Sequence, residues 1–121
     1  MYSPQVLDHF EHPRNSGDLP DVTAIVQVEN PACGDVMLLA ARISEGMISE
    51  VRFKAKGCVS AIACGSVVTE LVAGQSIERA GKISQQQIAA ALGGLSRETM
   101  HASHLAAEAL QELLKKIRHS A

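Results

Sequence analysis

Three short segments with a two-residue alternation of apolar and polar side chains constrain the fold of this chain more than any other feature. Residues 23–29, 36–43 and 47–54 each have the period of a β-strand, and Glu45-Gly46 between the last two is a hairpin signal. The core-facing residues are predicted to be Ala24, Val26 and Val28; Met37, Leu39, Ala41 and Ile43; and Met47, Val51 and Phe53. Because the links are short, the three strands are predicted to form an antiparallel meander with one covered face. The middle segment is apolar on both sides, which favours the central position.

Most of the remaining sequence has helical periodicity. A first helix is predicted to begin at Pro4 with Ser3 as its cap, to present Leu7 and Phe10 on one face and to end before Pro13. Further helices are expected at about 60–73, from a Ser84 cap through Leu92, and at about 99–118. The last of these has an apolar stripe of Ala106, Ala109, Leu110, Leu113, Leu114 and Ile117. Strands followed by helices indicate an α+β fold, a three-stranded antiparallel sheet packed against helices.

Composition limits the class of protein. With 121 residues, 46% of them hydrophobic, the chain is expected to form a single domain over 1–121. The net charge of −2 argues against nucleic-acid binding, and no apolar run approaches the ~20 residues of a membrane span. The N-terminus lacks the apolar stretch of a secretory signal. Three cysteines, an odd number, suggest reduced thiols and a cytoplasmic location.

A cluster of metal-ligand residue types is predicted at one end of the meander. Cys33 and Asp35 precede the second strand, and Cys58 follows the third. The second strand leads away from Cys33 and the third returns towards it, so the two cysteines are expected to meet. His101 lies near the start of the last helix. Two thiols, one carboxylate and one imidazole suffice for a metal ion or an iron–sulfur cluster.

Each of these residues also has a simpler interpretation. Cys33 could be a buried cysteine beside a turn-capping Asp35, and Cys58 a small buried side chain. As a ligand, Cys58 would have its thiolate stabilised by the N-terminus of the helix that follows.

The other histidines and the third cysteine give less specific signals. His104 shares a helix face with His101, so either imidazole could reach the site. Cys64 falls on an apolar helix stripe and is interpreted as a core residue. The remaining histidines, His9, His12 and His119, are interpreted as solvated or locally bonded.

Several ordered motifs resemble one known family over nearly the whole chain. They are Tyr2-Ser3 with Val6, Asp8-His9-Phe10, Pro13-Arg14-Asn15 with Gly17, Asn30-Pro31-Ala32-Cys33-Gly34-Asp35 with Met37, Phe53-Lys54, Gly57-Cys58 with Ser60-Ala61-Ile62-Ala63, Thr69-Glu70 with Gly74 and Ser76, and His101 ahead of Leu105-Ala106. The chain resembles the scaffold family for iron–sulfur cluster assembly, the IscU type and the N-terminal domain of NifU.

The resemblance implies a role and a set of ligands. Cys33, Asp35, Cys58 and His101 match the cluster- and zinc-binding positions of the family. Its members accept sulfur from a cysteine desulfurase, hold iron, build a [2Fe–2S] cluster and pass it to a carrier or acceptor. The aspartate helps to keep the cluster labile. Transient homodimers around a shared cluster are expected from the same resemblance.

The sequence departs from the family pattern in three places. The third cysteine, a principal sulfur acceptor in IscU-type members, directly follows the histidine, and here that position is Ala102. The Leu-Pro-Pro-Val-Lys motif for the dedicated Hsp70 chaperone corresponds to Leu95-Ser96-Arg97-Glu98-Thr99, which argues against that partner. The insertion after Cys58 that marks SufU-type proteins is absent. Cys64 and His104 stand where the family more often has a serine and an aliphatic residue, and they are candidates to replace the lost thiol.

Three functions are compatible with the sequence. The first is a non-enzymatic scaffold or carrier that binds a [2Fe–2S] cluster, or its iron, through the four candidate ligands. The second is a Zn²⁺-binding regulatory paralogue that contacts the assembly machinery without building clusters. The third, nucleophilic catalysis by Cys58 with His101 as base, is disfavoured because no motif supplies a substrate pocket.

Overall fold

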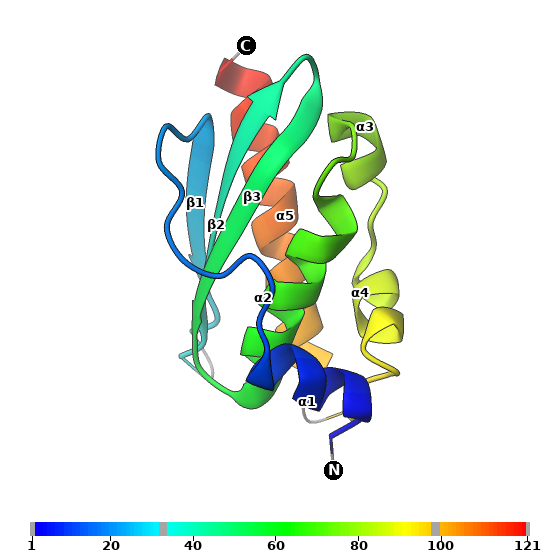
Figure 1. Cartoon of the computed structure of the whole chain (residues 1–121). Helices are drawn as coiled ribbons and strands as arrows, with labels where there is room; N and C mark the ends of the chain where they lie inside the picture. Colours follow the sequence, from blue (N-terminus) through cyan, green and yellow to red (C-terminus); the bar gives the residue numbers. More distant parts are fainter. Residues whose placement is uncertain (1, 32–33, 98–99, 121) are drawn as a thin grey trace.

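The computed structural model describes residues 2–31, 34–97 and 100–120. Its elements, in chain order, are α1 (Pro4–Glu11), β1 (Ala24–Glu29), β2 (Val36–Ser44), β3 (Met47–Lys56), α2 (Val59–Val72), α3 (Ile77–Ala80), α4 (Gln85–Ala91) and α5 (Met100–Ser120). Figure 1 shows the sheet on one side of the molecule, with α2 and α5 running along its inner face. The predicted α+β architecture is confirmed. Among the described residues, no helix is long and apolar enough to cross a membrane.

The sheet is the predicted antiparallel meander in the order β1-β2-β3. Val26 pairs with Leu39, which pairs in turn with Phe53, so one row of core-facing side chains crosses all three strands. The outer edge of β3 is covered by chain segments that are not strands. The loop at Asn15–Gly17 bonds to the backbone of Phe53, and the segment at Gly74–Gln75 bonds to that of Ile48.

A β-bulge corrects one predicted core residue. Arg42 pairs with Glu50 whereas Ile43 pairs with Ile48, so Ser49 is an extra residue on β3. One extra residue reverses the alternation of the side chains beyond it. Ile48 is therefore completely buried, and Met47, predicted to face the core, is 41% exposed.

Two helices close the core over the inner face of the sheet. The helix α2 packs on β3, α5 packs on β1 and β2, and the two helices pack on each other. The predicted stripe of α5 is buried throughout. With so few aromatic residues, aliphatic side chains fill most of the core, and Phe53 is its largest fully buried side chain. The short helix α4 lies against α5, on the side away from the sheet.

The first helix packs on the rest of the molecule through a face that does not contain Leu7 and Phe10. Ser3 caps it as expected, because its hydroxyl accepts the backbone N–H of Val6. Leu7 and Phe10 are exposed, however, and the buried residues are Val6 and His9. Leu7 and Phe10 share one face as predicted, but that face is the exposed one. The interpretation of His9 as a solvated or merely local side chain is wrong.

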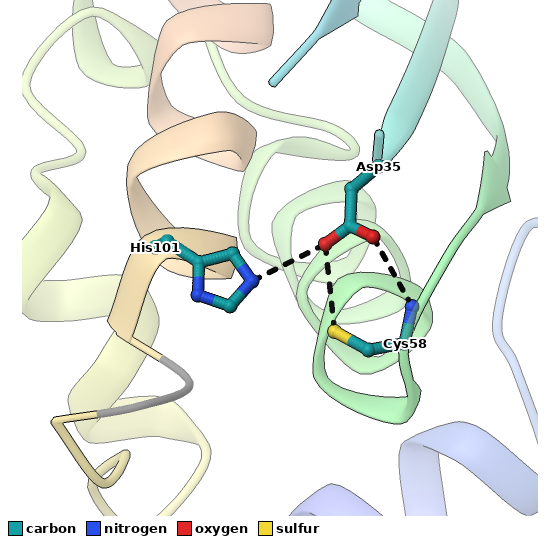
Figure 2. A group of neighbouring side chains, drawn as sticks. All are labelled: Asp35, Cys58 and His101. Atoms are coloured by element: carbon teal, nitrogen blue, oxygen red, sulfur yellow. Dashed lines mark hydrogen bonds and ion pairs between the residues drawn. The ribbon is translucent and has the colours of Figure 1, made fainter. Parts of the chain in front are cut away.

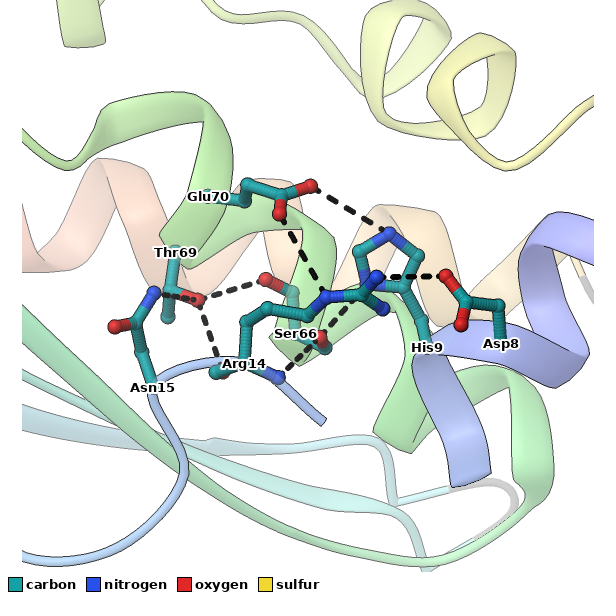
Figure 3. Close-up of polar contacts among 7 residues, drawn as sticks. All are labelled: Asp8, His9, Arg14, Asn15, Ser66, Thr69 and Glu70. Atoms are coloured by element: carbon teal, nitrogen blue, oxygen red, sulfur yellow. Dashed lines mark hydrogen bonds and ion pairs between the residues drawn. The ribbon is translucent and has the colours of Figure 1, made fainter. Parts of the chain in front are cut away.

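Polar contacts with α2 explain this orientation. Figure 3 shows His9 and Arg14 converging on the side chain of Ser66. His9 Nδ1 lies 2.7 Å from Ser66 Oγ, and the backbone N–H of Arg14 donates to the same oxygen at 2.9 Å. Burial is the main cause that lowers the pKa of His9. The nearby Arg14 guanidinium lowers it further, and Glu70 opposes both. Neutral His9 therefore anchors α1 to α2.

Candidate metal centre

Asp35 and Cys58 meet at one end of the sheet because β2 and β3 are adjacent and antiparallel. Val36 pairs with Lys56, so the residue before β2 lies beside the residues that follow β3. The backbone N–H of Cys58 donates to Asp35 Oδ1 at 3.4 Å, and its thiol donates to Oδ2 at 3.5 Å. Asp35 is only 4% exposed. Strand direction predicted that Cys33 and Cys58 meet; Cys33 lies outside the described residues, and Asp35, two residues after it, contacts Cys58.

The third member of the group is His101, from the first turn of α5. Its Nε2 lies 3.3 Å from Asp35 Oδ2, so the carboxylate stands between the imidazole and the thiol (Figure 2). One ligand atom from each of Asp35, Cys58 and His101 lies within 4.8 Å of the other two. A metal ion bonded at about 2.0–2.3 Å to N, O and S ligands fits within this spacing. The donor set suits Zn²⁺ and iron.

The electrostatics around the Cys58 thiol differ from the prediction. Cys58 is the N-cap of α2, and the backbone N–H groups of Ser60 and Ala61 favour its thiolate. Burial nevertheless raises the pKa of Cys58 above its usual value, and the negative charge of Asp35 adds to this effect. The expected stabilisation of the free thiolate by the helix is therefore outweighed. A bound cation would reverse the balance, because a coordinating thiol loses its proton.

The structure separates the other candidates from this group. Cys33, predicted to be a ligand, lies outside the described residues. His104 is exposed and borders a surface depression together with His101, Glu29 and Glu108, and it is not part of the group formed by Asp35, Cys58 and His101. Cys64 is fully buried, which raises the pKa of its thiol to about 12, and its interpretation as a core residue is confirmed.

Ala102 occupies the position of the missing cysteine. It is 0% exposed and belongs to the core cluster between the helices and the sheet. Among the described residues, no further His, Cys, Asp or Glu joins Asp35, Cys58 and His101 at ligand distance. Neither Cys64 nor His104 therefore takes the place of the absent thiol in this conformation.

The fold and the site define a small α+β domain whose candidate metal centre lies where one end of an antiparallel sheet meets two helices. Residues 1–120 match the family described as the NifU-like N terminal domain, and the chain belongs to that family. The resemblance inferred from the motifs is confirmed.

Individual relatives agree with this assignment. An iron–sulfur cluster assembly scaffold protein, IscU 1 of Archaeoglobus fulgidus, is 43% identical over 114 residues, covering 94% of this chain and 74% of the relative. The mitochondrial iron sulfur cluster assembly protein 1 of Schizosaccharomyces pombe is 47% identical over 123 residues, covering 98% of this chain and 63% of that protein. The fold, without regard to family, is also similar to the crystal structure of a nitrogen-fixing NifU-like protein (N-terminal) from Brucella abortus, with a TM-score of 0.76 at 18% identity, covering 98% and 94% of the two chains.

Proposed function

We propose that this chain is a scaffold or carrier that holds a labile [2Fe–2S] cluster, or the iron for one, and passes it to acceptor proteins. The observation that carries the proposal is the convergence of Asp35, Cys58 and His101 from three separate elements. Cys33, two residues before Asp35, is proposed as the fourth ligand. The names of the relatives, which are cluster assembly proteins, support the same function.

The three ligands suit cargo that must be released. A carboxylate and an imidazole bind iron less tightly than thiolates do, and mixed ligation is known in iron–sulfur clusters. Asp35 contributes negative charge from a buried position, whereas the side chain of His101 remains partly exposed. His101 is therefore proposed as the ligand on the solvent side, where an acceptor could approach.

The second candidate function is a Zn²⁺-binding regulatory protein of the same family. The specific observation in its favour is buried Ala102, at the position where IscU-type members have a sulfur-accepting thiol. The four proposed ligands would complete a tetrahedral Zn²⁺ site. Such a protein would contact a cysteine desulfurase without accepting sulfur.

Anaerobic reconstitution separates the two functions. The purified chain is incubated with Fe²⁺, sulfide and a cysteine desulfurase, and the visible spectrum and bound metal are measured. We expect the absorption of a [2Fe–2S] cluster, its loss in Cys58→Ser, and its retention in the control Cys64→Ala. Bound zinc with no cluster after reconstitution would exclude the scaffold function.

Substitution at Ala102 tests whether the missing thiol limits assembly. Ala102→Cys restores the family residue, and His104→Cys is the control that places an exposed thiol two residues away. If Ala102→Cys accepts sulfur from the desulfurase while the parent and the control do not, the chain carries clusters that another protein assembles. Equal sulfur acceptance by the parent would show that Cys33 or Cys58 suffices.

The proposal also includes the domain organisation, the location, the partners and the oligomeric state of the protein. A single domain, 1–121, works in the cytoplasm with a cysteine desulfurase and with cluster acceptors. It does so without the dedicated Hsp70 chaperone, and it forms transient homodimers when a cluster is shared.

A further inference from the structure

Gly57 lies between the end of β3 and the N-cap of α2, and it differs from most of the described glycines with positive φ; Gly93 also has a close neighbour, but that neighbour is the far end of the Gln5 side chain. The φ of Gly57 is +146°, a backbone conformation that residues with a side chain rarely adopt. At Gly17, with φ of +117°, an added Cβ would have no neighbour within 4 Å. The same holds for Gly34, Gly46, Gly74 and Gly94. At those positions the backbone conformation alone accounts for glycine.

A side chain at position 57 would occupy the same space as the carboxyl group of Asp35. A Cβ on Gly57 would lie 2.6 Å from Asp35 Cγ, 3.1 Å from Asp35 Cβ and closer still to Oδ1. Carbon atoms in contact are normally about 3.5–4.0 Å apart. The observed position of the carboxylate therefore requires that residue 57 has no side chain.

The carboxylate has little freedom to move without breaking the candidate centre. The backbone of Asp35 is fixed, because its carbonyl accepts the N–H of Asn30 at 2.8 Å. A larger residue 57 would therefore have to rotate the Asp35 side chain. Rotation would separate Oδ2 from both the Cys58 thiol and His101 Nε2, and Oδ1 from the backbone N–H of Cys58.

We propose that Gly57 is a positioning residue for the metal centre, and that its lack of a side chain holds the Asp35 carboxylate between the Cys58 thiol and the His101 imidazole. The proposal rests on the proposed function, because it treats Asp35 as a ligand. It assigns to Gly57 a role that acts through Asp35 and not through contact with the metal.

A double-mutant cycle with Co²⁺ as the probe tests the proposal. The full chain is compared with Gly57→Ala, Asp35→Ala and the double variant, and Gly17→Ala is the control for a methyl group at positive φ. Co²⁺ affinity and the visible spectrum of bound Co²⁺ are measured, together with urea unfolding of the metal-free proteins. We expect Gly57→Ala to weaken Co²⁺ binding by about 10- to 100-fold and to alter the spectrum. In the Asp35→Ala background, the same substitution should change affinity no more than Gly17→Ala does.

The outcomes distinguish the role of Gly57 from the proposed role of Asp35 as a ligand. If Gly57→Ala weakens binding equally with and without Asp35, Gly57 does not act through the carboxylate and the inference is wrong. If Asp35→Ala itself leaves Co²⁺ affinity unchanged, the proposed ligand set fails instead. If Gly57→Ala does not fold, Asp35→Ala, which removes the two closest atoms, should restore folding in the double variant. If neither Gly57→Ala nor the double variant folds, the inference is overturned.

Discussion

The thiol of Cys58 donates to Asp35 Oδ2 at 3.5 Å, in a half-buried position that raises its pKa. A raised pKa means that the free protein keeps this thiol protonated at neutral pH. Since the thiolate is the metal ligand, binding must release a proton. Metal affinity is therefore expected to increase with pH until the raised pKa is passed.

Thiol alkylation measures this property directly. In a Cys33→Ser background, where Cys64 is buried, the rate of reaction with iodoacetamide should reach half its maximum above the ordinary cysteine pKa of about 8.5. Asp35→Asn removes the nearby charge and should shift the profile to lower pH, whereas Asp18→Asn, a control at an exposed carboxylate, should not. An unchanged profile in Asp35→Asn would contradict the assigned influence of Asp35.

How far the site could be predicted differs from residue to residue. Strand direction alone predicted that the start of β2 and the end of β3 meet, which brings Asp35 to Cys58. His101 was identified through the family motifs, because nothing local indicates which face of α5 meets the sheet. The raised pKa of Cys58 was missed, since it depends on burial by residues distant in sequence. The role of Gly57 was missed for the same reason.

At the scale of elements, the docking of α1 on α2 should depend on pH through His9. The pKa of His9 is lowered in the folded protein, so below about pH 6.5 the unfolded chain binds a proton that the folded chain does not. The free energy of unfolding should therefore decrease as pH falls below that value, by at most about 1.4 kcal/mol per pH unit. Above it, His9 contributes no pH dependence.

Urea unfolding at pH 7.5 and 5.5 measures whether the free energy of unfolding decreases as the pH falls. His9→Asn, which removes the titrating group, should reduce the difference between the two pH values. His119→Asn, at an exposed histidine of α5, is the matched control and should leave the difference as in the parent. A parent that is equally stable at both pH values would show that His9 is protonated in the folded state.

The contact of α2 with β3 depends on Gly65, which lies directly over Phe53. A methyl group on Gly65 would come within 2.7 Å of Phe53 Cε2. Gly65→Ala should therefore destabilise the protein by about 1–3 kcal/mol in urea unfolding, although alanine is favoured over glycine in a helix by about 1 kcal/mol. In a Phe53→Leu background, where the ring is absent, the penalty should become smaller. A neutral or stabilising Gly65→Ala would contradict this packing.

The elements also show where sequence periodicity fails. Each strand was predicted within a few residues, because the two-residue period follows directly from one buried face. The bulge at Ser49 was missed, and with it the exposure of Met47, since Met47 and Ile48 are both apolar and the sequence does not show which of them faces the core. The burial of His9 was missed because its partner Ser66 is distant in sequence, and the apolar residues Leu7 and Phe10 are exposed instead.

For the whole molecule, metal binding and folding should be linked. Asp35, Cys58 and His101 come from the starts of β2, α2 and α5, so the group exists only when the sheet and both helices are assembled. Zn²⁺ at 100 times its dissociation constant should raise the free energy of unfolding by about 2.7 kcal/mol. Calorimetry should show no such gain in Cys58→Ser and a full gain in Cys64→Ala. A gain in Cys58→Ser would place the ion elsewhere.

The covered edge of β3 limits how this sheet can be extended. The backbone of β3 already bonds to the Asn15–Gly17 loop and to the segment at Gly74–Gln75, so a strand from another chain has no free edge there. In the part of the chain that the structure describes, β1 is the other edge strand of the sheet. On that edge the Ile25 carbonyl accepts the Lys116 ammonium at 2.7 Å, so a second copy added at β1 would displace this contact and would use up the β1 edge of both molecules. Strand-to-strand association of this protein would therefore stop at two chains and would not continue into a filament.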